Sequence, residues 1–244
     1  MIFNIITLFP EFFKGCFDVS LIKKAQEKGL IKINILNLRD FTPYKHKQCD
    51  DKPYGGGAGM VLMLVPIYNA IIHLKKHQPE TKIIYPSPQG KIFNFQKAKE
   101  LAKLNSITIL CGHYEGIDNR VIENLIDEEI SIGDYILTGG EIAAVVLIDA
   151  ISRYVKNVVG NEDSVLTDSF ENFLLKYPQW TRPKVFKGMK VPEILLSGDH
   201  KKIAEWRLKM QIELTKRKRP DLYKIYENLK NKEVGKNGTD NKRN

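Results

Sequence analysis

The sequence predicts an α/β protein in which a mostly parallel sheet carries helices on both faces. Strand-like and helix-like segments alternate over the first 155 residues of the 244-residue chain. Such alternation is typical of parallel sheets, whose strands are joined by crossing helices. The second observation is a set of three turns, rich in glycine or proline, that each follow an apolar strand-like run. Ligands bind outside the carboxyl ends of the strands in such sheets, so the turns predict one pocket.

The strands and helices of this sheet follow from the spacing of apolar residues. Short apolar runs bounded by turn residues predict strands. These are Ile2–Leu8, Leu30–Leu38, Thr81–Tyr85, Ile107–Cys111 and Glu128–Ile132. Apolar residues at helical spacing with charges on the other side predict helices. These are Glu11–Lys28, in one or two pieces, Val65–Lys76, Phe95–Leu104, Arg120–Ile126 and Ile142–Val155.

The segment Arg39–Met60 is polar, aromatic and rich in glycine, and it shows no periodicity. A loop of this length inside a compact domain is usually functional or disordered. Its glycine cluster, Gly55–Gly59, raises the alternative of a nucleotide-binding transferase. Met60-Val61-Leu62 follows the cluster where a phosphate-binding P-loop has Gly-Lys-Ser/Thr, which counts against that alternative.

The second part of the chain has a different character. Residues 1–155 are predicted to form the α/β domain, and the polar residues 156–170 a flexible linker. Residues 171–230 are predicted to form a small helical domain that contains two helices, Lys201–Arg217 and Asp221–Lys230. Asp199 is expected to cap the first of these helices. Residues 231–244, rich in lysine, asparagine and glycine, are predicted to be disordered.

Composition narrows the class of protein. The formal net charge of +9 favours a polyanionic partner such as nucleic acid, although a solvated basic surface would give the same excess. Three widely spaced cysteines indicate neither a disulfide framework nor a zinc site. The amino terminus lacks the basic region of a signal peptide, and no apolar run approaches the ~20 residues of a membrane span. We therefore expect a soluble, cytoplasmic protein.

The three turns are Tyr85–Gly90, Cys111–Asp118 and Ile130–Glu141. Each of them alone is explained as well by a tight structural turn. Together they lie at strand ends, where glycine lets backbone N–H groups approach a ligand. Their convergence is the argument from the residues themselves for a binding site.

Several phrases together resemble one family. They are L-F-P-E (8–11), R-D-F-T (39–42), K-H-K (45–47), D-D-x-P-Y-G-G-G-x-G-M (50–60), S-P-Q-G (87–90), C-G-x-Y-E-G-I-D (111–118), S-I-G-D-Y-I-L-T-G-G-E (131–141), D-S-F (168–170) and Y-P-Q-W-T-R-P (177–183). From near Met1 to about Arg219 the sequence resembles the TrmD family of bacterial tRNA (guanine-N1)-methyltransferases, part of the SPOUT superfamily. The two departures are His113, where many relatives have arginine, and Ala143, where they often have proline.

The resemblance implies a reaction and an architecture. The reaction is transfer of a methyl group from S-adenosyl-L-methionine to N1 of guanine 37 in tRNA, next to the anticodon. The architecture is a trefoil knot in the α/β domain, which binds the donor, a C-terminal domain that binds tRNA, and a homodimer with shared active sites. The resemblance also implies dependence on Mg²⁺. No spacing of residues points to a fixed metal site, so we expect no metal ligands.

The resemblance also assigns residues. Asp168 corresponds to the base that removes the N1 proton, and Arg153 to the cation that stabilises charge on O6. From the residues alone, a solvated acid in a polar segment is the commoner role for a residue such as Asp168, and a complement to a helix dipole the commoner role for Arg153. The expected donor-binding residues are Pro86, Ser87, Pro88, Gly112, Tyr114, Glu115, Gly116, Ile132, Gly133, Asp134, Tyr135, Ile136, Leu137, Gly139 and Gly140.

Basic residues are expected to form the tRNA surface. They are Lys45, His46, Lys52, Arg182, Lys201, Lys202, Arg207, Lys209, Lys216, Arg217 and Arg219. Two alternatives stay open at the level of sequence: a related SPOUT methyltransferase acting on another RNA, and an RNA-binding protein without catalytic activity. The second alternative would not require three glycine-bearing turns at strand ends.

Overall fold

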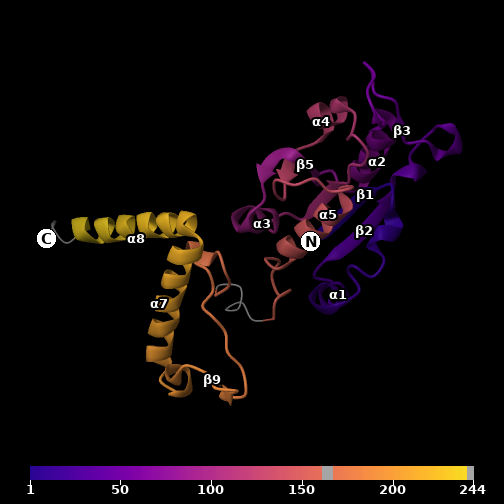
Figure 1. Cartoon of the computed structure of the whole chain (residues 1–244). Helices are drawn as coiled ribbons and strands as arrows, with labels where there is room; N and C mark the ends of the chain where they lie inside the picture. The colour runs from indigo at the N-terminus through magenta and orange to yellow at the C-terminus, as the bar shows by residue number, and fades with distance from the viewer. Residues whose placement is uncertain (161–166, 241–244) are drawn as a thin grey trace. The chain divides into compact units, whose positions relative to one another are not determined.

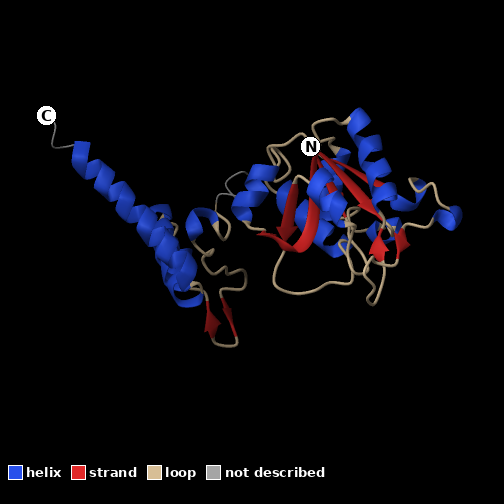
Figure 2. Cartoon of the chain, turned by 90° about the horizontal axis from the view of Figure 1, so that it is seen from above, coloured by secondary structure: helices blue, strands red, loops and turns tan. Residues whose placement is uncertain are grey.

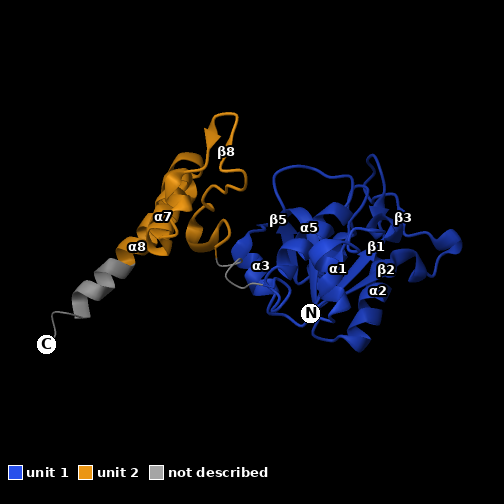
Figure 3. Ribbon diagram, turned by 90° about the horizontal axis from the view of Figure 1, so that it is seen from below, with its two compact units in different colours: residues 1–161 blue, residues 162–244 orange. Residues whose placement is uncertain are grey.

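The computed structural model describes residues 1–160 and 167–240, with the side chains of residues 1–160 and 167–232. The chain divides into two compact units, Met1–Asn161 (unit 1) and Glu162–Asn244 (unit 2) (Figures 1 and 3). The predicted linker, residues 156–170, includes residues 161–166, which lie outside the described part of the chain.

Unit 1 is built on a five-stranded sheet in the order β2-β1-β6-β5-β7, in which every pair of neighbours is parallel (Figure 2). The strands are β1 Ile2–Thr7, β2 Lys32–Asn37, β5 Lys82–Ile92, β6 Ser106–Leu110 and β7 Glu128–Ser131. The five predicted strands are all present. The predicted α/β class with a parallel sheet is therefore confirmed.

Helices cover both faces of this sheet. They are α1 Ser20–Glu27, α2 Leu64–His77, α3 Phe95–Leu101, α4 Asn119–Leu125 and α5 Glu141–Ser152. The sheet separates two hydrophobic cores, and successive residues of β1 contribute to one or the other. Phe3 and Ile5 pack with α1, α3 and α5, whereas Ile6 packs with α2 and α4. The segment predicted as one or two helices, Glu11–Lys28, forms the short 3₁₀ helix Pro10–Phe13 and α1.

One strand extends beyond its predicted end. The sequence predicts that Thr81–Tyr85 ends in a turn, but β5 continues to Ile92. Its pairing with β7 has a register shift, because both Pro86 and Lys91 align with Ile130. The predicted turn is thus an irregularity inside a strand. The prediction failed because the hydrogen bonds to β7 that resume after the irregularity are not visible in the sequence.

The long segment 39–60 contains more structure than the sequence indicates. It includes the 3₁₀ helices Leu38–Asp40 and Lys45–Lys47 and the short strand β3, Asp50–Asp51. β3 pairs antiparallel with β4, Val61–Leu62, so the glycine cluster forms the connection of a small hairpin. A two-residue strand is too short to show an alternating pattern, which explains why it was missed.

Unit 2 consists of two long helices and a short hairpin. Its elements are η4 Glu171–Phe173, β8 Val185–Phe186, β9 Met189–Lys190, η5 Glu193–Leu196, α7 His200–Lys218 and α8 Pro220–Asp240. The Asp199 side chain accepts a hydrogen bond from the backbone N–H of Lys202 and caps α7 as predicted. Buried Thr215 of α7 accepts a hydrogen bond from the Leu175 backbone N–H, which fixes the extended segment against the helix.

The end of the chain differs from its predicted form. The sequence predicts a helix that ends at Lys230, followed by a disordered tail, residues 231–244. In the structure α8 continues to Asp240, and residues 241–244 lie outside the described part. No proline follows Pro220, and the glycines Gly235 and Gly238, which disfavour a helix without preventing it, do not end α8. Within the described residues, no helix has the length and hydropathy needed to cross a membrane.

Candidate functional site

The three predicted turns line one cavity of about 350 Å³ in unit 1. The lining comes from residues 85–88 of β5, residues 112–116 after β6, and residues 130–133 and 135–140 of β7 and the loop that follows it. Ala143 of α5 completes the wall. We refer to this cavity as the strand-end pocket. Two of its walls follow the ends of β6 and β7 beside the N-terminus of α5, where parallel α/β sheets generally bind ligands, and the third is the irregular part of β5.

The structure brings together every predicted donor-binding residue except Asp134, whose side chain is exposed and does not line the pocket. Six further residues line it that were not among the predicted donor-binding residues, although His113 and Ala143 had been noted as departures from the family. They are Tyr85, His113, Ile130, Ser131, Thr138 and Ala143. All but Ala143 lie within the predicted turns, so the available signal was their position at strand ends.

Glycines allow the walls of the pocket to approach one another closely. A Cβ atom on Gly112 would lie 2.9 Å from the ring of Tyr85, so only glycine leaves room for this buried tyrosine. Burial raises the pKa of Tyr85, and the nearby Glu129 carboxylate adds to this shift. The tyrosine therefore stays neutral and contributes a phenol ring to the pocket wall.

The first turn of α5 is tied to the end of β1. Glu141 is buried, and its carboxylate accepts a hydrogen bond from the hydroxyl of Thr7, with 2.7 Å between the oxygens. An acidic residue in the first turn of a helix also complements the helix dipole. This buried contact fixes the point at which the third loop becomes a helix.

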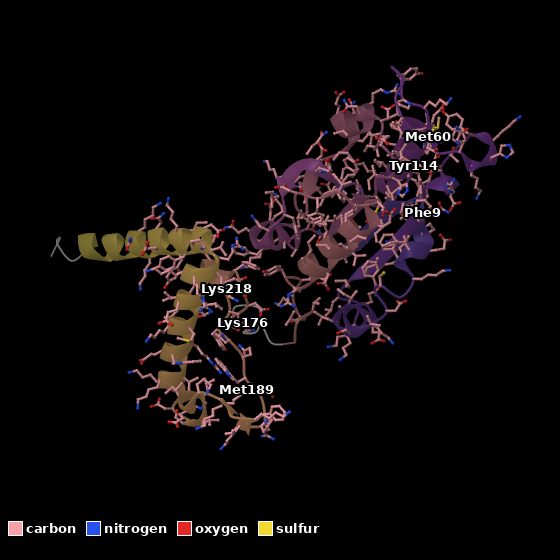
Figure 4. The ribbon with its side chains drawn as sticks, viewed as in Figure 1. Phe9, Met60, Tyr114, Lys176, Met189 and Lys218 are labelled. Atoms are coloured by element: carbon pink, nitrogen blue, oxygen red, sulfur yellow. The ribbon has the colours of Figure 1, made fainter. Side chains whose placement is uncertain are left out.

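The second loop has a strained residue at its centre. Tyr114 has a φ of 58°, in the left-handed region that few residues other than glycine adopt. The rings of Phe9 and Tyr114, both labelled in Figure 4, flank the ring of His113 at 4.8 and 4.7 Å between centroids. Strain of this kind costs on the order of 1–3 kcal/mol and clusters at ligand sites.

Glu115 connects the strand-end pocket to the glycine-rich hairpin. It lines the pocket, and a Cβ atom on Gly59 would lie 2.6 Å from its Cγ and Oε1 atoms. The Glu115 backbone N–H also donates a hydrogen bond to the carbonyl oxygen of Met60. The segment 50–60 is therefore a support for the second wall of the pocket.

The two expected catalytic residues belong to different units. Arg153 is the C-terminal cap residue of α5, so the helix that begins at the pocket also carries this arginine. Asp168 belongs to unit 2, where its carboxylate forms an ion pair with Lys176 at 2.9 Å. The structure thus places Arg153, but not Asp168, on the same unit as the pocket.

The expected tRNA-binding residues are on the surface. All eleven are exposed except Arg219, which is partly buried and forms an ion pair with Asp221. Within the described part of the chain, no group of three or more His, Cys, Asp and Glu side chains is arranged to hold a metal ion. No metal ligands are therefore assigned.

Comparisons with known proteins point to one family. The family model described as "tRNA (Guanine-1)-methyltransferase TrmD" matches residues 1–225. The tRNA (guanine-N(1)-)-methyltransferase of Caldanaerobacter subterraneus subsp. tengcongensis is 54% identical over 224 residues, which is 92% of each chain. That of Clostridioides difficile is 50% identical over 226 residues, covering 92% of this chain and 98% of the relative.

A solved structure shows the same likeness. The crystal structure of tRNA (m1G37) methyltransferase from Aquifex aeolicus matches with a TM-score of 0.75 and 40% identity, covering 90% of this chain and 93% of that one. The family model, the relatives and the fold therefore agree with the motifs found in the sequence. The chain belongs to the TrmD family of tRNA (guanine-1)-methyltransferases.

Proposed function

We propose that the strand-end pocket binds S-adenosyl-L-methionine and that the protein transfers its methyl group to N1 of guanine 37 in tRNA. The observation that carries this proposal is the convergence of all three motif-bearing loops on one cavity, in a chain of this family. Use of S-adenosylmethionine follows from the family. The pocket residues and their roles are our assignment.

The pocket suits this donor in size and chemistry. Its volume of about 350 Å³ lies within the range of small-molecule sites, roughly 300–1,000 Å³. Tyr114, Tyr135 and Ile136 line it although their side chains are 46%, 55% and 81% exposed. A bound adenosyl group would cover this apolar surface, and the glycine backbones of the second and third loops would supply polar contacts.

The acceptor atom requires help from the protein. Guanine N1 carries a proton at neutral pH, so a base must remove that proton as the N1–methyl bond forms. S-adenosylmethionine supplies an electrophilic methyl group, and the bond between that methyl and sulfur breaks. We assign the base to Asp168, which receives the N1 proton. Arg153 stabilises the negative charge that develops on O6.

Two further roles follow from the geometry. Glu115 places a carboxylate at the wall of the pocket, where it attracts the positively charged sulfonium end of the donor. The exposed basic residues of unit 2 bind the phosphates of the tRNA, consistent with a net charge of +9. Unit 1 is then the donor-binding domain and unit 2 the tRNA-binding domain.

We further propose that the protein acts as a cytoplasmic homodimer with a knotted unit 1. Each active site combines the strand-end pocket of one subunit with Asp168 of the other. This arrangement agrees with the placement of Arg153 and Asp168 in different units. The family resemblance extends to Mg²⁺ dependence, for which the described residues offer no ligand cluster, and we route no step through a metal.

The direct test of the reaction is methyl transfer from labelled S-adenosylmethionine to tRNA transcripts. A transcript with guanine 37 should be methylated at N1, and a transcript with adenine 37 should not. A protein that binds the donor but leaves the first transcript unmodified would show that the substrate assignment is wrong.

The shared site is tested by mixing two inactive variants, Asp168→Asn and Gly140→Ala. If subunits exchange randomly, half of the dimers are mixed, and each mixed dimer has one intact site. The mixture should then recover about a quarter of the wild-type activity. No recovery after verified exchange would place both residues of a site in the same subunit.

A further inference from the structure

We propose that a second cavity, in unit 2, binds an unpaired base of the tRNA substrate by stacking on Trp180. This cavity of about 330 Å³ is formed by the segment 177–184, by Val191 directly after β9, and by residues of η5 and α7. We refer to it as the Trp180 cavity. The inference rests on the proposed function, because it takes tRNA as the partner of unit 2.

The first argument is the aromatic lining. The side chain of Trp180 is 40% exposed and lines the cavity, and its ring packs against Trp206 at 5.5 Å between centroids. Trp206 does not line the cavity, so it supports Trp180 from outside. A supported ring with an exposed part can stack on a nucleobase, an interaction worth about 1–3 kcal/mol per base.

The second argument is charge. Arg182, Lys184 and Arg207 line the cavity, and no aspartate or glutamate does. Among the described residues these three cations form no ion pair within 4 Å, whereas Lys176 and Lys202 are paired with Asp168 and Asp199. Unneutralised cations around an aromatic wall match the phosphates that flank an unstacked base.

The third argument is preorganisation. The guanidinium group of Arg207 lies over the ring of Tyr177, 4.8 Å from its centroid. A cation–π contact of this kind holds the guanidinium group at the ring, from where its N–H groups can reach a phosphate or a base carbonyl. The contact fixes the arginine before any ligand binds, which lowers the entropic cost of binding.

Another cavity of unit 2 adjoins the Trp180 cavity. It shares Trp180, Arg182 and Val191 with the Trp180 cavity and is bounded by Phe186 and Met189 of the hairpin. Those two hydrophobic side chains are 53% and 65% exposed. Figure 4 shows Met189 at the hairpin end of unit 2, away from Lys218 at the other end of α7. Two adjoining cavities suit a single strand better than a double helix, whose bases are already stacked on one another.

The chain offers a direct fluorescent probe of this assignment. It has two tryptophans, so Trp206→Phe leaves Trp180 as the sole tryptophan. We expect Trp180 emission to be quenched by an unmodified tRNA transcript and by a single-stranded RNA heptamer. An RNA duplex of seven base pairs and poly-glutamate should leave it unchanged. Equal quenching by the duplex or by poly-glutamate, or no quenching by the transcript, would overturn the proposal.

Affinity measurements provide a second test of the Trp180 cavity. Trp180→Ala in the full-length protein should raise the Kd for tRNA roughly 5- to 150-fold, the equivalent of ~1–3 kcal/mol of stacking, while Trp180→Phe retains most of the affinity. Arg207→Gln should lower the slope of log affinity against log salt by about one. Lys28→Gln removes an exposed charge of unit 1 that is not among the expected tRNA-binding residues, and it should leave the Kd unchanged. An effect of Trp180→Phe as large as that of Trp180→Ala would contradict stacking.

Methyl transfer by the wild-type protein separates this inference from the proposed function. If guanine 37 is methylated but Trp180 is not quenched, the cavity assignment is wrong and the reaction stands. If Trp180 is quenched but no methyl is transferred, the cavity assignment stands and the reaction is wrong.

Discussion

The backbone N–H of Gly140 donates a hydrogen bond to the carbonyl oxygen of Gly112, with 2.8 Å between nitrogen and oxygen. This bond joins the third loop of the strand-end pocket to the second. A Cβ atom on Gly140 would lie 2.8 Å from the Cα atom of Cys111 and 2.9 Å from the nitrogen of Gly112. Both neighbours are backbone atoms, so neither can rotate away to make room.

Gly140→Ala should therefore separate the two loops. The φ of Gly140 is −77°, which alanine adopts readily. The effect therefore comes only from the steric clash of the added Cβ atom. We expect a loss of about 1–3 kcal/mol in the free energy of unfolding, as for other overpacked sites, and a large rise in the Kd for S-adenosylmethionine. Urea denaturation and calorimetry measure the two quantities. Gly160→Ala, with no atom within 4 Å of the added Cβ, is the control and should change neither.

Gly59 and Gly56 form a matched pair for the role of Glu115. Their φ angles are 81° and 82°, so alanine at either position carries the same backbone strain, about 1–2 kcal/mol. Only the Cβ atom at Gly59 would meet the Glu115 side chain. We expect similar falls in melting temperature for both variants, but weaker donor binding for Gly59→Ala alone. Equal donor affinities would mean that the position of Glu115 does not matter to the donor.

Asp168→Asn tests the base without changing the shape of the side chain. The amide cannot take the N1 proton, so we expect kcat to fall by about 10²- to 10⁴-fold, while the Kd for the donor stays constant. Single-turnover methyl transfer at saturating donor is the measurement. The exposed carboxyl of Asp18 provides the control variant, Asp18→Asn, which should retain the wild-type rate. A wild-type rate for Asp168→Asn would assign the base elsewhere.

The partly buried carboxylate of Glu128 predicts how stability depends on pH. It forms ion pairs with Lys82 at 2.7 Å and Lys97 at 2.8 Å, joining β5, β7 and α3. Burial acts to raise the pKa of Glu128, but the hydrogen bonds from Lys82 and Lys97 outweigh it, and the net pKa lies below its ordinary value. Folding therefore favours the ionised form.

The stabilisation from Glu128 is fully present above the unfolded pKa of about 4.3 and is lost as the pH falls through the lower folded pKa. At pH 7, Glu128→Gln should cost about 1–3 kcal/mol in the free energy of unfolding, because two lysines lose a charged partner. The difference between variant and wild type should shrink as the pH falls below about 4.3. Urea denaturation at a series of pH values tests this, and a constant difference would contradict it.

The α/β class and the two pocket loops that follow β6 and β7 were predictable because both depend on local patterns. Apolar runs such as Ile107–Cys111 and the glycines beside them mark where strands end. The continuation of β5 past Pro86 was not predictable, since the pairing with β7 that sustains it involves residues more than 35 positions away. The exposure of Asp134 could not be inferred from the sequence for a similar reason. Its neighbours in the motif line the pocket, and only the path of the loop decides which side chain turns outward.

The Trp180 cavity was not predictable either, because it depends on contacts between residues far apart in the sequence. The sequence shows an aromatic, basic segment followed by a basic helix, but not that Tyr177 and Arg207, thirty positions apart, would stack. Nothing local in Y-P-Q-W-T-R-P predicts the hairpin β8–β9, whose two strands have only two residues each.

Helix α5 has a consequence for how this protein can vary. It begins next to Gly140 at the pocket and ends at Arg153, and its residues Leu147, Ile148 and Ile151 are fully buried. Each residue of an α-helix advances about 1.5 Å and turns about 100° around the axis. One residue inserted between Gly140 and Arg153 would rotate the arginine about a quarter turn and move the buried stripe out of phase with the core. Substitutions on the exposed side of α5 can therefore be accepted, whereas insertions and deletions within it would disturb both the core packing and the position of Arg153 relative to the pocket.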